Sequence, residues 1–161
     1  MPLAGDLVTA SDVAQLYATK TAAESVTNST TLQNDDELFV TLEASTTYQV
    51  DLVMLYDGAA AGDFKVGFTG PSGATLQGVV VGITPAGATS GDDVTAYAVL
   101  GTANNFGAIG TGTTLGMHFS GLLRTSTAVG ALTVQWAQIT ASATATRVFA
   151  DSYLALRRIT A

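Results

Sequence analysis

Apolar residues alternate with polar or small ones along most of the chain, which is the pattern of half-buried β-strands. The strongest segment is 47–56, whose alternate positions form one apolar face: Tyr48, Val50, Leu52, Met54 and Tyr56. Its other face includes Val53 and Leu55, so we expect this strand to lie in the middle of a sandwich, with both sides covered. The same alternation predicts further strands over residues 37–43, 64–68, 76–83, 94–100, 114–123, 132–139 and 147–159.

Three of these segments also indicate which side chains face the core. The apolar face of 114–123 is formed by Leu115, Met117, Phe119, Gly121 and Leu123. The corresponding face of 132–139 is formed by Leu132, Val134, Trp136 and Gln138. Trp136 is therefore expected in the core or in an interface, and not on an exposed sugar-binding platform. In the last segment Leu154 and Leu156 share one face, and Tyr153 and Ile159 share the other.

Turn-forming residues separate the predicted strands. Asp57-Gly58 ends the strongest strand, residues 70–73 form a proline-glycine turn, and residues 33–36 are expected to form a turn before the strand at 37–43. Many short strands without a second helix predict an all-β fold, an antiparallel β-sandwich over residues 23–161. Long connections at 84–93 and 101–113 favour a jelly roll, with an immunoglobulin-like sandwich as the alternative.

Residues 1–22 differ from the rest and are predicted to form an N-terminal arm. Thr9 and Asp12 have the spacing of a capping box. Val13, Leu16 and Tyr17 follow at helical spacing on one face, which predicts one short helix. A helix of about nine residues is not stable alone in water, so the arm must dock on its own domain or on a neighbouring subunit. The residues expected to make this attachment are Leu7, Val13, Leu16 and Tyr17.

Composition excludes several classes of function. Only 12% of the residues are charged and the net charge is −7, so we expect no nucleic-acid partner, which would need a basic face. No apolar run is long enough to predict a membrane span, and the N-terminus lacks the regions of a signal peptide. The absence of cysteine excludes disulfides, thiolate metal sites and cysteine nucleophiles. A surface rich in Thr, Ala and Gly suits a subunit that packs against other chains.

Acidic clusters are the first candidates for chemistry. They lie at 35–37, at 92–93, and at Asp57 with Asp63. Oxygen ligands from such loops could form part of a calcium site. The clusters lack the spacing of known calcium loops, however, so we expect them to be solvated turns.

Two single residues are the remaining candidates. His118 is the one histidine, and we expect it to be hydrogen-bonded or exposed and not a metal ligand. Asp51 lies inside the most apolar segment, where it is either buried and paired with an arginine or placed on the solvent face. The chain has no Gly-x-Ser-x-Gly motif. We therefore predict that the protein is not an enzyme and needs no catalytic residue, metal or cofactor.

Several stretches resemble virion proteins of tailed bacteriophages that infect actinobacteria, of the head decoration, head fibre or minor tail type. The similar stretches are residues 4–12, 25–38, 47–50, 64–73, 121–124 and 132–138. The resemblance covers most of residues 20–160. It implies a β-sandwich component of the particle, commonly trimeric, that an N-terminal segment attaches to the virion. It implies no catalytic residues.

The resulting hypothesis is a structural virion protein, most specifically a capsid decoration (cement) protein. It would form a homotrimer, bind the major capsid protein through its arm, and have neither nucleic acid nor membrane as a partner. It would be made in the host cytoplasm and lie on the capsid surface. The alternative is a minor tail or fibre protein that binds a host-surface glycan, which requires Tyr17, Tyr97 or Trp136 to face solvent. A depolymerase is a third, weaker possibility.

Overall fold

The structure is a computed structural model that describes residues 15–85 and 93–160. Strands account for all the regular structure in these ranges. Their bounds are β1 Gln15–Thr19, β2 Glu24–Val26, β3 Gln33–Leu42, β4 Thr47–Gly58, β5 Phe64–Thr69, β6 Thr75–Ile83, β7 Asp93–Val99, β8 Asn104–Phe106, β9 Gly110–Arg124, β10 Gly130–Ala137, β11 Thr146–Val148 and β12 Tyr153–Thr160.

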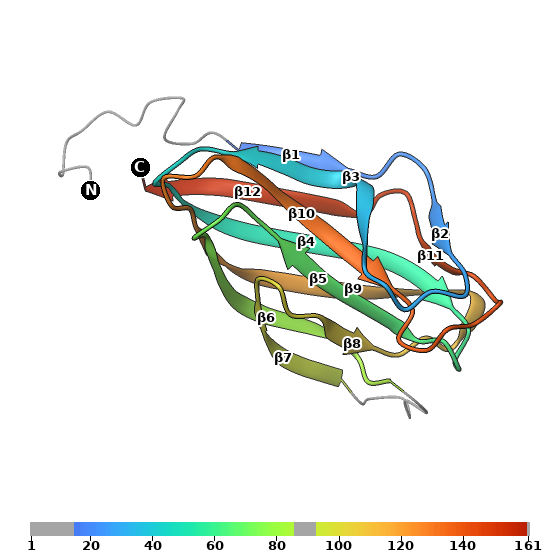
Figure 1. Cartoon of the computed structure of the whole chain (residues 1–161). Helices are drawn as coiled ribbons and strands as arrows, with labels where there is room; N and C mark the ends of the chain where they lie inside the picture. Colours follow the sequence, from blue (N-terminus) through green and yellow to red (C-terminus); the bar gives the residue numbers. More distant parts are fainter. Residues whose placement is uncertain (1–14, 86–92, 161) are drawn as a thin grey trace.

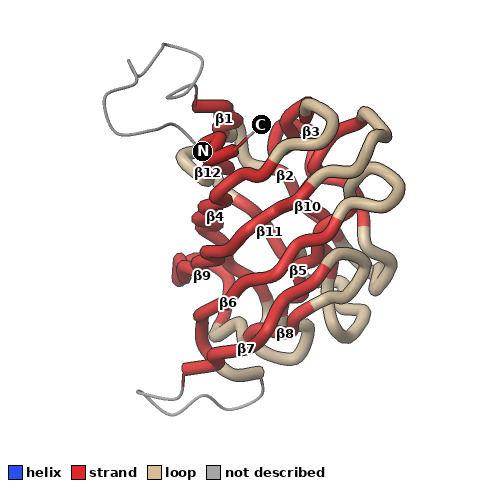
Figure 2. Tube along the Cα trace, turned by 90° about the vertical axis from the view of Figure 1, so that its left-hand side faces the viewer, coloured by secondary structure: helices blue, strands red, loops and turns tan. Residues whose placement is uncertain are grey.

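The strands form two antiparallel sheets (Figure 1). The large sheet has the order β1-β12-β4-β9-β6-β7, and β11 and β2 extend it beside β4. The small sheet has the order β3-β10-β5-β8. Figure 2 shows them as two layers, with β12, β4 and β9 on one side and β3, β10 and β5 on the other. The predicted all-β fold with antiparallel sheets is therefore confirmed, and the two layers agree with a sandwich.

The eight strands from β3 to β10 pair in a nested series. β6 pairs with β7, β5 with β8, β4 with β9, and β3 with β10, each pair antiparallel. The chain thus behaves as one long hairpin whose tip is the β6–β7 connection. Successive pairs fall alternately into the two sheets, because β3, β5, β8 and β10 belong to the small sheet and the others to the large one.

A single hydrophobic core fills the space between the sheets. The ring centroids of Phe68, from the small sheet, and Phe119, from the large sheet, lie 4.8 Å apart. Trp136 is fully buried, as its position in the alternation predicted. The predicted inner faces of 47–56, 114–123 and 132–139 are also confirmed, and the strand at 47–56 lies centrally between β12 and β9.

The prediction of an N-terminal helix is wrong for the part that contains Leu16 and Tyr17. These residues lie in β1, which pairs with β12 in the register Leu16↔Leu156 and Tyr17↔Ala155. The edge of β12 offers the backbone of β1 hydrogen-bond partners along one side, and this outweighs a local helical pattern. Residues 9–14 lie outside the described residues.

The predicted turn at 33–36 is wrong as well, because these residues belong to β3. The pairing with β10 is nevertheless irregular here, since Phe39 lies opposite Thr133 while Asn34 already lies opposite Gln135. The turn chemistry of Asp35 and Asp36 produces a bulge within the strand. Two other boundaries differ: the last predicted strand is divided into β11 and β12, and β8 lies inside the predicted connection 101–113.

Two glycines face each other where β6 and β9 pair, Gly78 opposite Gly121. A Cβ atom on Gly78 would lie 2.4 Å from the carbonyl oxygen of Ser120 and 2.6 Å from the ring of Phe119. A Cβ on Gly121 would meet the same ring at 2.6 Å. The Phe119 ring therefore covers both glycines, and it fits there because neither glycine has a side chain.

Candidate functional site

A groove lies on the outer face of the large sheet. Its floor is Ala155 on β12, whose small side chain lies between the larger Tyr17 on β1 and Asp51 on β4. Tyr153 and Arg157 lie two residues away on either side along β12, so they face the same way. The groove has a volume of about 960 Å³ and is lined by Gln15, Tyr17, Thr19, Lys20, Thr21, Gln49, Asp51, Ala150, Asp151, Tyr153, Ala155 and Arg157.

Hydrogen bonds hold the polar walls of the groove in place. The Tyr153 hydroxyl donates to Oδ2 of Asp51 at 3.1 Å, and Nε2 of His118 lies 2.5 Å from Oδ1. Burial, the hydrogen bond to Asp51 and the carboxylate charge raise the pKa of Tyr153, so its hydroxyl remains a donor at neutral pH. At the other end Arg157 donates to Oε1 of Gln49 at 2.8 Å. Asp51 and Arg157 are thus oriented before any ligand arrives.

The groove combines an aromatic ring with polar groups. Tyr17 is 60% exposed. Among the lining residues, two positive charges, on Lys20 and Arg157, balance two negative charges, on Asp51 and Asp151. The Asp51–His118 pair resembles a base with its orienting acid. However, these side chains are 37% and 48% exposed on an open sheet, where water competes for every contact. The arrangement suits binding of a polar ligand better than catalysis.

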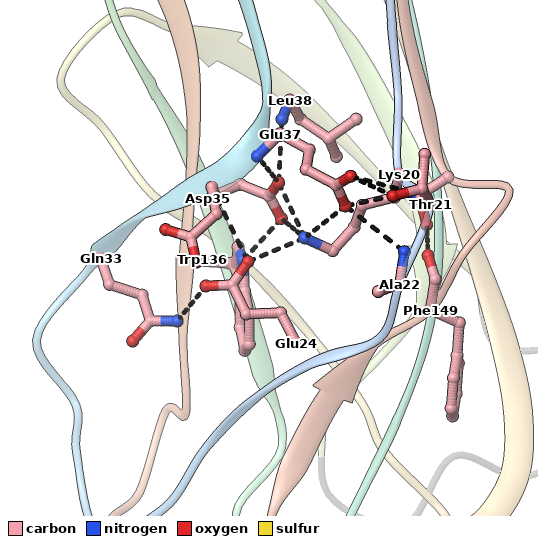
Figure 3. Close-up of polar contacts among 12 residues, drawn as sticks. Lys20, Thr21, Ala22, Glu24, Gln33, Asp35, Glu37, Leu38, Trp136 and Phe149 are labelled. Atoms are coloured by element: carbon pink, nitrogen blue, oxygen red, sulfur yellow. Dashed lines mark hydrogen bonds and ion pairs between the residues drawn. The ribbon is translucent and has the colours of Figure 1, made fainter.

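Behind one end of the groove lies a buried ionic network centred on Lys20 (Figure 3). The Nζ atom of Lys20 is 2.7 Å from Glu24, 2.9 Å from Asp35 and 3.9 Å from Glu37. The side chain of Lys20 is 1% exposed and that of Asp35 is not exposed at all. Burial alone would lower the pKa of Lys20, but hydrogen bonds to Glu24 and Asp35 and their charges outweigh it and raise the pKa.

Asp35 joins the two sheets through this network. Besides Lys20, its carboxylate accepts hydrogen bonds from the backbone N–H groups of Glu37 at 3.0 Å and Leu38 at 2.9 Å. The indole Nε1 of Trp136 donates to it at 3.0 Å. Four donors satisfy one buried carboxylate, so the charge is tolerated inside the sandwich. The network fixes the end of β1 against β3 and β10, and so positions the edge strand that holds Tyr17.

A second buried carboxylate, Asp57, anchors β11 to β4. Arg147 donates to it through Nε at 2.9 Å and through a second guanidinium nitrogen, and the N–H of Gly112 donates at 2.7 Å. Burial would raise the pKa of Asp57, but the hydrogen bonds from Arg147 and Gly112 and the Arg147 charge outweigh it and lower the pKa. Asp57 therefore remains ionised in the folded protein at pH values where a free aspartate begins to protonate.

The Asp57 pair predicts a specific acid sensitivity. Because the folded pKa is lowered, its contribution to stability is fully present above the unfolded value of 3.8 and is lost as the pH falls through the folded pKa. Asp57→Asn is expected to lower the free energy of unfolding by about 1–3 kcal/mol at neutral pH. The difference in unfolding free energy between Asp57→Asn and the unmodified protein should shrink in acid. Urea unfolding at a series of pH values measures it, with the exposed Asp151→Asn as control; a pH-independent difference would contradict the assignment.

Of the four residues predicted to attach the arm, two lie within the described part of the chain. Leu7 and Val13 lie outside the described residues, Leu16 packs against the core, and Tyr17 lines the groove. Asp51 lies on the solvent face, which was one of its two expected positions, and its partners are His118 and Tyr153, not an arginine. Nothing in the sequence marks Ala155 as the floor of the groove, because only the pairing register shows which side chains surround it.

The expectation that the acidic clusters are solvated turns is wrong for Asp35, Asp57 and Asp63, which are buried and have partners within the protein. Asp35 and Asp57 bind Lys20 and Arg147, and Asp63 accepts the N–H of Ala108 at 2.9 Å. In the described ranges, His and acidic side chains nowhere gather in a group of three that could hold a metal ion. Those same ranges contain no helix long and apolar enough to span a membrane. Asp92 lies outside the described residues.

No protein-family model and no curated protein matches the chain. Among solved structures, the tripod from the baseplate of bacteriophage Tuc2009 is similar over 98% of this chain and 72% of its own, with 14% identity and a TM-score of 0.41. A structure of the infectious bursal disease virus Gt strain is similar over 90% and 40%, with 11% identity and a TM-score of 0.23. The VP2 subviral particle of that virus is similar over 92% and 42%, again with 11% identity and a TM-score of 0.23. Likeness at this level says nothing of what the chain does.

Proposed function

We propose that this chain is a non-enzymatic structural protein of a phage particle and that its sandwich is a jelly roll. The nested pairing of β3 to β10 supports the topology, because a jelly roll is one long antiparallel hairpin wrapped into two sheets. The resemblance of residues 25–38 and 64–73 to virion proteins supports the role. The low charge of the chain suits a subunit that packs among copies of itself and a shell.

The first candidate role is capsid decoration by a homotrimer that grips the major capsid protein through its N-terminal arm. The observation that supports it is the position of the start of β1. Gln15 lies opposite Arg157, near the end of β12, so the arm joins the sandwich at one end of an edge strand. From there a segment could reach a shell without disturbing the core. Binding only to assembled shells would stabilise them by mass action, and three arms per trimer would add their contacts.

Deleting residues 1–14 is expected to weaken binding to shells that lack the protein by more than about tenfold, because it removes the arm that includes Leu7 and Val13. The cut stops before β1, since a longer deletion would remove Lys20 and the buried network with it. Co-sedimentation with purified shells measures the binding. Tyr17→Ala, which leaves the arm in place, is the matched variant for the exposed part of β1. Undiminished binding by the deleted protein, with its oligomeric state and melting temperature unchanged, would rule out attachment through the arm.

The second candidate role is a tail or fibre protein that binds a glycan on the host surface. A specific observation favours it: Tyr17 is exposed beside polar side chains in the groove, as that hypothesis requires, whereas Trp136 is buried. Electron microscopy of particles with a labelled chain separates the two roles. Even coverage of the head supports decoration, and a few copies at the tail support a fibre or tail protein.

A further inference from the structure

We propose that the hollow above Ala155 binds one sugar ring of an uncharged glycan. The inference draws its biological setting from the second candidate role. The chemistry of sugar binding depends only on the groove, so the proposal is tested on the isolated protein. The result does not depend on where the chain lies on the particle.

The shape of the hollow follows from the strand register. Ala155 is 8% exposed and has Tyr17 directly opposite on one neighbouring strand and Asp51 directly opposite on the other. Tyr153 and Arg157 close the two ends along β12. Within the open groove, the methyl group of Ala155 is thus a low point among four longer side chains. A single sugar ring would lie over it.

The apolar surface of the hollow fits the C–H face of a sugar. The exposed ring of Tyr17 presents a π-face with partial negative charge, which attracts the weakly positive C–H groups of a pyranose. The methyl group of Ala155 adds an apolar floor beside it. A flat aromatic side chain with few rotatable bonds offers this contact at little cost in conformational entropy.

The polar walls fit the hydroxyl edge of the same ring. The Asp51 carboxylate accepts from Tyr153, lies beside His118, and has further lone pairs for ligand hydroxyl groups. Arg157 donates one hydrogen bond to Gln49 and has further N–H groups to donate. Neighbouring hydroxyl groups of a sugar act both as donors and as acceptors. Asp51 on β4 is an acceptor and Arg157 on β12 is a donor, and both are oriented in advance. Together they can bind hydroxyl groups of both kinds.

The charge balance favours an uncharged sugar over an acidic one. Lys20 is already paired with Glu24 and Asp35, so Arg157 is the positive charge left beside the carboxylates of Asp51 and Asp151 in the groove lining. The whole chain has a net charge of −7. A uronic acid or a phosphorylated sugar would meet a negative protein with only Arg157 available to it, and so should bind more weakly.

Saturation-transfer NMR tests the proposal directly with free methyl glycosides of neutral hexoses and pentoses, and with glucuronic acid as the acidic comparison. At least one neutral glycoside is expected to receive saturation at its ring C–H protons, with a dissociation constant in the region of 1 mM, as befits one sugar ring on an open surface. Glucuronic acid should bind several-fold more weakly. Titration calorimetry of the best ligand gives the affinity of each variant.

Two variants should weaken binding by about tenfold or more: Ala155→Leu, which fills the hollow, and Tyr17→Ala, which removes the ring. Tyr17→Phe keeps the ring and should bind nearly as the original. Ala131→Leu makes the same change at a half-buried alanine on β10 of the small sheet and is the matched control. The proposal is overturned by no transfer to any neutral glycoside, by stronger binding of the acid, or by full binding in a folded Ala155→Leu protein.

Discussion

Lys20→Met should lower the free energy of unfolding by about 3–5 kcal/mol. Methionine has a similar length and fills nearly the same buried volume. The loss of stability would therefore be electrostatic and would not come from a cavity. The Asp35 carboxylate, with no exposure to solvent, would lose the buried counter-charge that Lys20 provides, while Glu24 and Glu37 remain nearby. Urea unfolding at neutral pH, followed by the fluorescence of Trp136, measures the change.

Two comparisons make the Lys20 result specific. Lys65→Met removes a cation that is outside the network, on β5, and should cost far less. Adding Asp35→Asn to Lys20→Met removes the stranded charge and should recover part of the loss, because the two sites are directly coupled. A loss below about 1 kcal/mol would contradict the role of this lysine, since that is the range of an exposed ion pair.

The pH dependence of the same pair has a definite sign. Because the folded pKa of Lys20 is raised, its contribution is fully present below the unfolded value of 10.5 and disappears as the pH rises through the folded pKa. The difference in stability between the original protein and Lys20→Met should therefore stay constant around neutral pH and shrink in strong alkali.

Gly78→Val should lower the free energy of unfolding by about 3 kcal/mol. The new Cβ atom would overlap the backbone oxygen of Ser120 at 2.4 Å, and a backbone atom cannot turn aside as a side chain can. β6 would have to separate from β9, or the Phe119 ring would have to leave its place against Phe68. Thermal and urea unfolding measure the loss, and NMR shifts of the Phe68 and Phe119 rings show where the strain goes.

Gly116→Val is the matched control for this substitution. Gly116 lies on β9, on the opposite face, and a Cβ there would have Leu55 as its nearest neighbour at 3.9 Å, an ordinary contact. Valine favours extended backbone, so this variant should be neutral or slightly more stable. An equal loss of unfolding free energy at both positions would show that replacing any strand glycine is costly. The crowding around Phe119 would then not be the cause.

The strands of this fold could be predicted because their side chains alternate. The inner faces of β4, β9 and β10 follow directly from that alternation, including the burial of Trp136. β1 could not be predicted in this way, since Leu16 and Tyr17 fit a helical spacing equally well and only the free edge of β12 decides between the two. Asp35 has the sequence of a turn, and its inward position depends on Lys20, which is distant in the sequence.

The groove was even less accessible to prediction from sequence. Ala155 has no distinguishing neighbours along the chain, and its importance comes from the residues opposite it on two other strands. Asp51, His118 and Tyr153 approach one another only because β4 lies between β9 and β12. Pairing register between distant segments is a property of the whole sheet, so a single sequence without relatives does not reveal it.

The nested pairing of the strands also sets the order in which the chain can fold. Closing the loop between β6 and β7 involves only a short segment, whereas joining β3 to β10 closes a loop of most of the chain. Contacts this distant in sequence make folding slow. β4, moreover, needs β12 on one side, so during synthesis this edge of β4 stays open until β12 has been made. The newly made chain therefore passes through a period in which unpaired apolar strands are exposed to aggregation.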